Sequence, residues 1–142
     1  MRKFATFAIA IMTILSLALV PIPILAAIQN SEIIEIQPFW DNGSTVFPML
    51  SGFGNTAFAD VTIIGRPGTT QILATITLSR VAPNGSLTTV RTWANQGVSG
   101  SHFSFSGSNA VTSGNTYRLT VSAHVTRDGV TEHVSGWTER RF

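Results

Sequence analysis

The chain has 142 residues, no cysteine and a formal charge of +2, from nine Lys and Arg against seven Asp and Glu. The lack of cysteine excludes disulfides, thiolate metal sites and cysteine nucleophiles. Two of the nine cations are Arg2 and Lys3, so residues 28–142 carry seven positive and seven negative charges. Their arginines are dispersed, whereas a phosphate-binding surface needs a concentrated basic patch, so we expect no nucleic-acid partner.

Residues 1–27 have the pattern of a secretory signal peptide. Two basic residues precede an uncharged run over residues 4–25, and a pair of alanines follows it. Pro21 and Pro23 would end the apolar helix just before a small-residue cleavage point, which we place after Ala27 or one residue earlier. The alternative is an uncleaved membrane anchor, because the run of 22 residues approaches the roughly 20 that span a bilayer. We therefore expect a secreted, extracellular protein or, if the segment is uncleaved, one that is anchored in a membrane through this segment alone.

Beyond the leader the sequence predicts strands and no helix. Runs of β-branched and aromatic residues alternate with clusters of Gly, Asn, Ser and Pro, which is typical of a sandwich or barrel. We expect an all-β, immunoglobulin-like antiparallel β-sandwich of seven or eight strands over residues 45–142, with residues 28–44 as an N-terminal arm or first strand. The expected strands are 32–37, 45–50, 56–64, 70–80, 87–95, 101–106, 116–126 and 130–139.

A hairpin is predicted around Pro83, with the runs on either side of it as the two strands. Pro83, Asn84 and Gly85 suit a type I turn followed by a bulge. This turn would pair Leu78 with Val90 on the inner face, and it would pair Thr75 with Trp93 on the outer face. A shift of one residue would instead bury Trp93.

The segment "SHFSFSGSNAVTSGNTYRLTVSA" has the layout of a tyrosine corner. Val111, a Ser-Gly-Asn turn and the chain's single tyrosine, Tyr117, follow one another at the start of a predicted strand. In such a corner the ring packs in the core and the hydroxyl bonds a backbone group a few residues upstream. The alternative is that Tyr117 is an ordinary aromatic residue at the rim.

The last hairpin is the clearest feature of the sequence. In "TYRLTVSAHV" apolar and polar residues alternate without exception, as a half-buried antiparallel strand requires. Asp128-Gly129 suits a two-residue type I′ turn, and this turn sets the register. The expected pairs are Ala123 with Val134 inside, and His124 with His133, Ser122 with Ser135, Thr120 with Trp137 and Arg118 with Glu139 outside.

Several of these segments resemble a known family. They are Ile76-Thr77-Leu78, Val90-Arg91-Thr92-Trp93, Gly107-Ser108, Val111-Thr112-Ser113-Gly114, Tyr117-Arg118-Leu119-Thr120-Val121 and Ala123. The family comprises short exported proteins of Gram-positive, clostridia-like bacteria and is catalogued as a domain of unknown function. The resemblance covers residues 45–142, departs at Leu87, where tryptophan is frequent, and implies fold and export but no activity. More distantly, the chain is similar to fibronectin type III and bacterial immunoglobulin-like sandwiches.

The opposed His124 and His133 are a candidate metal site. Opposed β-carbons lie about 5 Å apart, so both imidazoles can reach one ion. Zinc normally takes three or four protein ligands, and His102 is the one further histidine. The alternative, which we prefer, is a solvated polar face, and we expect no metal and no cofactor.

Catalytic patterns are weak. The run "GVSGS" does not fit the nucleophile elbow, and the seven acids fit ordinary surface positions.

Exposed flat aromatic residues mark recognition surfaces, and the candidates are Trp93, Trp137 and Trp40, unless they pack under neighbouring segments.

We therefore expect an exported, non-catalytic binding or structural module. Its partner would be a cell-wall or environmental glycan or a surface protein. The alternatives are a metal-assisted hydrolase using His124 and His133, and a secreted effector or toxin-like protein.

Overall fold

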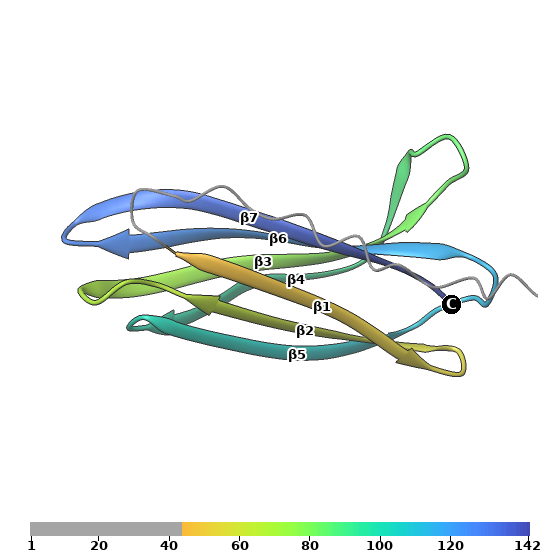
Figure 1. The fold of residues 1–142 in the computed structure, drawn as a ribbon, viewed down its shortest axis with the longest axis horizontal. Coiled ribbons are helices and arrows are strands. Elements are labelled where there is room, and N and C mark those ends of the chain that lie inside the picture. Colours follow the sequence, from red (N-terminus) through yellow and green to blue (C-terminus); the bar gives the residue numbers. More distant parts are fainter. Residues whose placement is uncertain (1–43) are drawn as a thin grey trace, which may run out of the picture.

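The computed structural model describes residues 44–142, which form seven antiparallel strands (Figure 1). The strands are β1 (Thr45–Phe53), β2 (Thr56–Ile64), β3 (Thr69–Val81), β4 (Leu87–Ser99), β5 (His102–Ala110), β6 (Thr116–Arg127) and β7 (Val130–Arg141). The predicted all-β class is confirmed for this part of the chain. The predicted leader, the strand at 32–37 and Trp40 lie outside the described residues. Within the described range no helix is long and apolar enough to cross a membrane.

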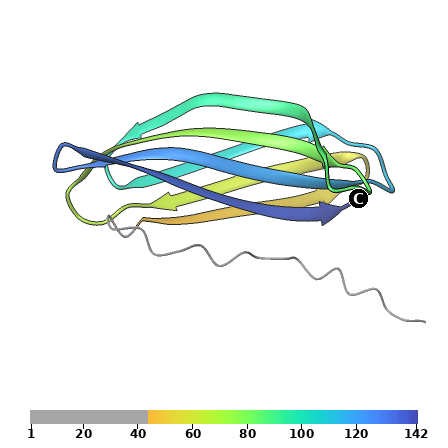
Figure 2. The same cartoon turned by 90° about the horizontal axis from the view of Figure 1, so that it is seen from above.

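The strands form two stacked sheets. One sheet has the order β1-β2-β5, and the other has the order β4-β3-β6-β7. Seen from above, the four-stranded sheet lies over the three-stranded one (Figure 2). The core lies between them and is built from the inward residues of every strand except β4. Its largest fully buried side chains are Leu50, Ile63, Ile72, Ile76, Leu78, Leu119, Val61, Val121, Val125 and Val134.

The β6–β7 hairpin has the predicted register. Asp128 and Gly129 both have positive φ (50° and 77°), as a type I′ turn requires. His124 lies opposite His133, and Ala123 opposite Val134. The outer pairs predicted for Ser122, Thr120 and Arg118 are confirmed as well.

The register predicted for the β3–β4 hairpin is wrong beyond its first pairs. Ser79 lies opposite Thr89 as the turn predicts, but Leu78 lies opposite Arg91 and not Val90, because a register shift falls between Leu78 and Ser79. Such a β-bulge adds one unpaired residue and moves every later side chain to the other face. Trp93 consequently lies opposite Ile76, on the inner face.

Strand β4 is an edge strand of irregular shape. Within residues 44–142 it pairs with β3 alone, and nearly all of its residues are exposed. A second register shift separates the pairs of Ala74 and Ile76, and Asn95 in this region has a left-handed φ of 55°. The strand is therefore bent twice along its 13 residues.

The tyrosine corner is confirmed. The backbone N–H of Thr112 donates a hydrogen bond of 2.9 Å to the hydroxyl of Tyr117, a residue that is only 3% exposed. The ring also meets Phe142 edge-on, with 5.6 Å between centroids. The N–H of Phe142 donates to the carbonyl of Asn115 at 3.0 Å. These contacts join the β5–β6 loop to the end of β7.

We predict that Tyr117→Phe lowers the free energy of unfolding by about 1 kcal/mol, because the Thr112 N–H loses its partner. Urea denaturation measures the change. Ser99→Ala, which removes a hydroxyl from an exposed position of β4, should stay within about 0.5 kcal/mol of the wild type. Equal stabilities of the two variants would contradict a structural role for the corner.

Candidate binding surface

The outer side of the three-stranded sheet carries exposed apolar side chains. In β1 and β2 the residues alternating with the buried Val46, Leu50 and Ala59 must point outward, because successive side chains in a strand take opposite faces. We call this outer side the β1–β2–β5 face. Its large exposed hydrophobic residues are Phe47, Met49, Phe53, Phe58 and Ile64.

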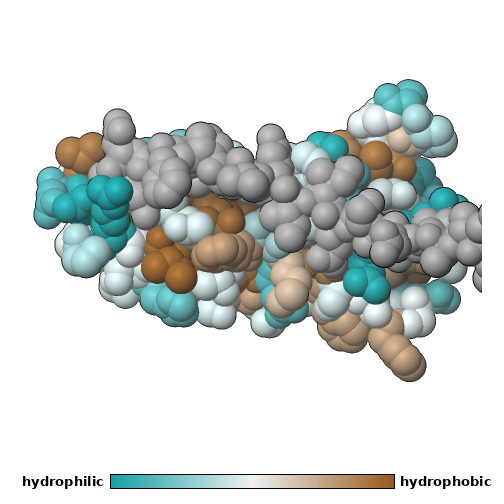
Figure 3. All heavy atoms as spheres, in the orientation of Figure 1, coloured by the Kyte–Doolittle hydropathy of each residue, from teal (hydrophilic) through white to brown (hydrophobic). Residues whose placement is uncertain are grey.

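This concentration is unusual for the molecule. Ten large hydrophobic residues of the described chain are exposed, and five of them share this one face. Phe53 is 86% exposed and Phe58 is 42% exposed. Brown and tan atoms follow the course of β1 in Figure 3. Single exposed apolar residues need no explanation, but a contiguous group of them marks an interaction surface.

Strand β5 adds a polar column to the same face. Ser104, Ser106 and Ser108 occupy three successive outward positions of this strand, opposite Thr62, Asp60 and Phe58. The hydroxyl of Ser106 donates a hydrogen bond of 2.6 Å to Oδ1 of Asp60. The face therefore runs from apolar side chains on β1 to hydroxyls on β5, with a carboxylate between them.

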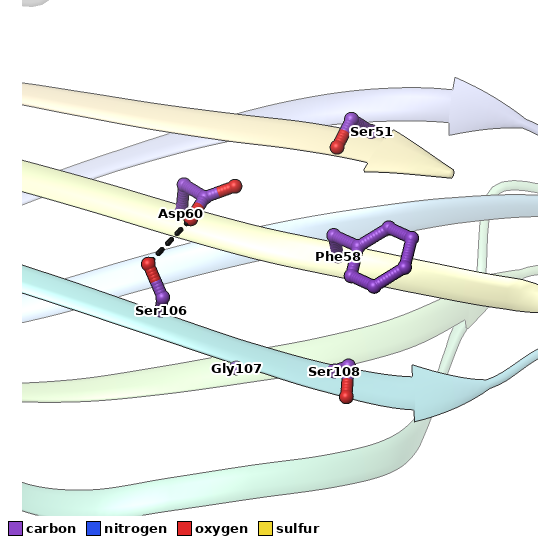
Figure 4. A pocket seen from close by; sticks show the side chains of 6 residues that line it. All are labelled: Ser51, Phe58, Asp60, Ser106, Gly107 and Ser108. Carbon is purple, nitrogen blue, oxygen red and sulfur yellow. Dashed lines mark hydrogen bonds between the residues drawn. The ribbon is translucent and has the colours of Figure 1, made fainter. Parts of the chain in front are cut away.

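A shallow depression of about 420 Å³ lies in the middle of the face (Figure 4). Its lining consists of Ser51, Phe58, Asp60, Ser106, Gly107 and Ser108. Phe58 and Asp60 project from the same side of β2, because they are two residues apart. The depression thus offers a flat ring beside a carboxylate and several hydroxyls, which are groups that can contact a ligand with both apolar and polar surface.

The two described tryptophans do not form a common surface. Trp93 is half-buried against the core, and its ring centroid lies 5.5 Å from that of Phe105. The prediction that Trp93 points outward is therefore wrong. Trp137 is on the outer side of the four-stranded sheet, opposite Thr120 as predicted. The guanidinium carbon of Arg118 lies 4.2 Å from its ring centroid, so one face of the indole is already occupied.

The histidines form a pair without a third ligand. The rings of His124 and His133 have centroids 5.4 Å apart, and His133 Nε2 shares a hydrogen bond of 2.8 Å with the hydroxyl of Ser122. His102 lies opposite Ile64 on the β1–β2–β5 face, in the other sheet. Among residues 44–142 there is no group of three or more His, Asp or Glu side chains that could hold a metal. The pair offers two ring nitrogens, which is fewer ligands than catalytic zinc sites use.

Sequence reasoning missed the exposed phenylalanines. In "TVFPMLSGF" both alternating sets contain apolar residues, Val46 and Leu50 in one and Phe47, Met49 and Phe53 in the other. The pattern therefore does not say which set is buried. The available signal was an excess of apolar residues on both sides of one strand, which indicates either a strand buried on both faces or an exposed apolar face.

The chain matches no protein-family model, no curated protein and no solved structure. The family resemblance carried by the β3–β6 segments therefore stays a prediction. What the protein does has to be argued from the chemistry of its own surfaces.

We predict that the histidine pair binds Zn²⁺ weakly, because two imidazoles supply half of the usual tetrahedral ligand set. Isothermal titration should show that His133→Ala removes this binding. His102→Ala is the matched control and should titrate like the wild type, since His102 lies in the other sheet. Loss of binding in His102→Ala, or retention in His133→Ala, would place the zinc ligands elsewhere.

Proposed function

We propose that this chain is an exported, non-catalytic binding module that recognises a cell-wall or environmental glycan through the β1–β2–β5 face. The observation that carries the proposal is the exposed Phe58, which lines one depression together with Asp60 and the serines of β5. Export is proposed from the leader-like residues 1–27. The tyrosine corner at Tyr117 supports an immunoglobulin-like sandwich of the kind found in extracellular modules.

The chemistry of the face fits a sugar. A pyranose presents an apolar C–H face and a rim of hydroxyls, so it needs an aromatic ring on one side and hydrogen-bonding groups at its edge. Phe58 supplies the ring, and Ser106, Ser108 and Asp60 supply donors and acceptors. The depression is open to solvent, and it can therefore accept one unit of a longer polymer.

The phenylalanines replace the tryptophans as the proposed contact residues. Trp93 packs against Phe105, and Trp137 packs against Arg118, so neither presents both ring faces to a ligand. Phe58 has no aromatic or cationic neighbour of this kind among the described residues. Desolvating its ring with a sugar therefore displaces only water.

We predict that Phe58→Ala weakens binding to an insoluble polysaccharide at least about tenfold, equivalent to about 1.4 kcal/mol, because the stacking surface is lost. Co-sedimentation with chitin measures the bound fraction. Leu73→Ala is the matched control, since Leu73 is 38% exposed but belongs to the four-stranded sheet.

The same experiment distinguishes the two aromatic surfaces. Trp137→Ala should leave binding unchanged if the phenylalanine face is the site. Binding that survives Phe58→Ala and disappears in Trp137→Ala would move the site to the outer side of β6 and β7. Circular dichroism of each variant checks that the sandwich is intact.

A further inference from the structure

We propose that the glycan bound by the β1–β2–β5 face carries free, protonated amino groups, as a glucosamine polymer does. This inference rests on the proposed function and narrows it to a ligand class. It follows from the charge on the face. Asp60 is the sole carboxylate among the outward positions of β1, β2 and β5, and neither Lys nor Arg occupies any of these positions.

The negative charge of Asp60 has no cationic partner within the described residues. Arg118 pairs with Glu139, and Arg127 pairs with Asp128, both on the other sheet. The one hydrogen bond to Asp60 comes from Ser106 and engages Oδ1. A carboxylate can accept about four hydrogen bonds, so Oδ2 is left for a donor from outside. A charged donor such as an ammonium binds a carboxylate more strongly than a neutral hydroxyl does.

The aromatic neighbour favours the same ligand. The face of a phenylalanine ring attracts cations electrostatically, in addition to its apolar contact. Phe58 and Asp60 stand two residues apart on β2, about 6.7 Å along the strand. This spacing is comparable with the span of one pyranose unit together with its exocyclic groups. A sugar that stacks on Phe58 can thus extend an amino group to Asp60 while a hydroxyl reaches Ser108, the register partner of Phe58.

Asp60 also argues against two other occupants of this face. A second copy of the chain packed face to face would bury the carboxylate, and burial of a charge without a partner is strongly unfavourable. An acidic polysaccharide would bring like charges toward Asp60 with no arginine or lysine to offset them. A cationic, hydrated polymer brings the missing positive charge and keeps water at the site.

Co-sedimentation of the purified protein with chitosan and with chitin tests the inference, because the two polymers share a backbone and differ in N-acetylation. The wild type should bind chitosan at least about tenfold more tightly than chitin, which corresponds to one charge-assisted hydrogen bond. Asp60→Asn should abolish the preference for chitosan, so that the variant binds chitosan and chitin equally well. Asp60 is half-exposed, so the amide fits without repacking the core.

Asp128→Asn is the matched control. It makes the same change in net charge on the β6–β7 turn, and asparagine tolerates the positive φ of that position. An equal loss in Asp128→Asn would show a nonspecific charge effect and overturn the inference. Equal binding of both polymers by the wild type overturns it too but leaves the proposed function standing. Binding to neither polymer, or a dimer in analytical ultracentrifugation that Phe58→Ala dissociates, overturns both.

Discussion

Burial of the inner side of β3 is the constraint on which the rest of the structure depends. This strand pairs with β4 on one side and β6 on the other, and its inward residues Ile72, Ala74, Ile76 and Leu78 are almost completely buried. The chain has no cysteine, so no covalent link assists this core. Because neighbouring residues of a strand point to opposite faces, burial of one set determines what the outer faces carry. The surface of the domain is thus largely a consequence of its interior.

The two outer faces that result are chemically different. The four-stranded sheet presents hydroxyls, the histidine pair and the ion pair of Arg118 with Glu139. The three-stranded sheet presents phenylalanines around a single carboxylate. Solvation of apolar side chains is unfavourable, so keeping Phe53 and Phe58 exposed lowers solubility unless they contact a partner. This contrast is the physical basis on which we propose the β1–β2–β5 face as the recognition surface.

Local signals predicted the fold where they act over short distances. Strict alternation in β6, the Asp128-Gly129 turn and the Tyr117 corner each depend on residues close in sequence, and all three were predicted correctly. The bulge beside Val90 was not predictable, because no residue type requires it, and it alone turned Trp93 inward. The candidate site was harder still. Asp60 meets Ser106 only because β2 pairs with β5, and 46 residues separate the two side chains. A single sequence contains no signal for that pairing.

The irregular shape of β4 has a consequence for how copies of the protein meet. A free sheet edge is a template on which another strand can continue the hydrogen-bond ladder, and this is how many β-proteins aggregate into fibrils. The bulge beside Val90 and the left-handed Asn95 interrupt the regular spacing of hydrogen-bonding groups along β4. A straight incoming strand can therefore pair with only part of it. The same irregularity that turns Trp93 inward thus makes the longest edge strand among the described residues a poor template for another copy.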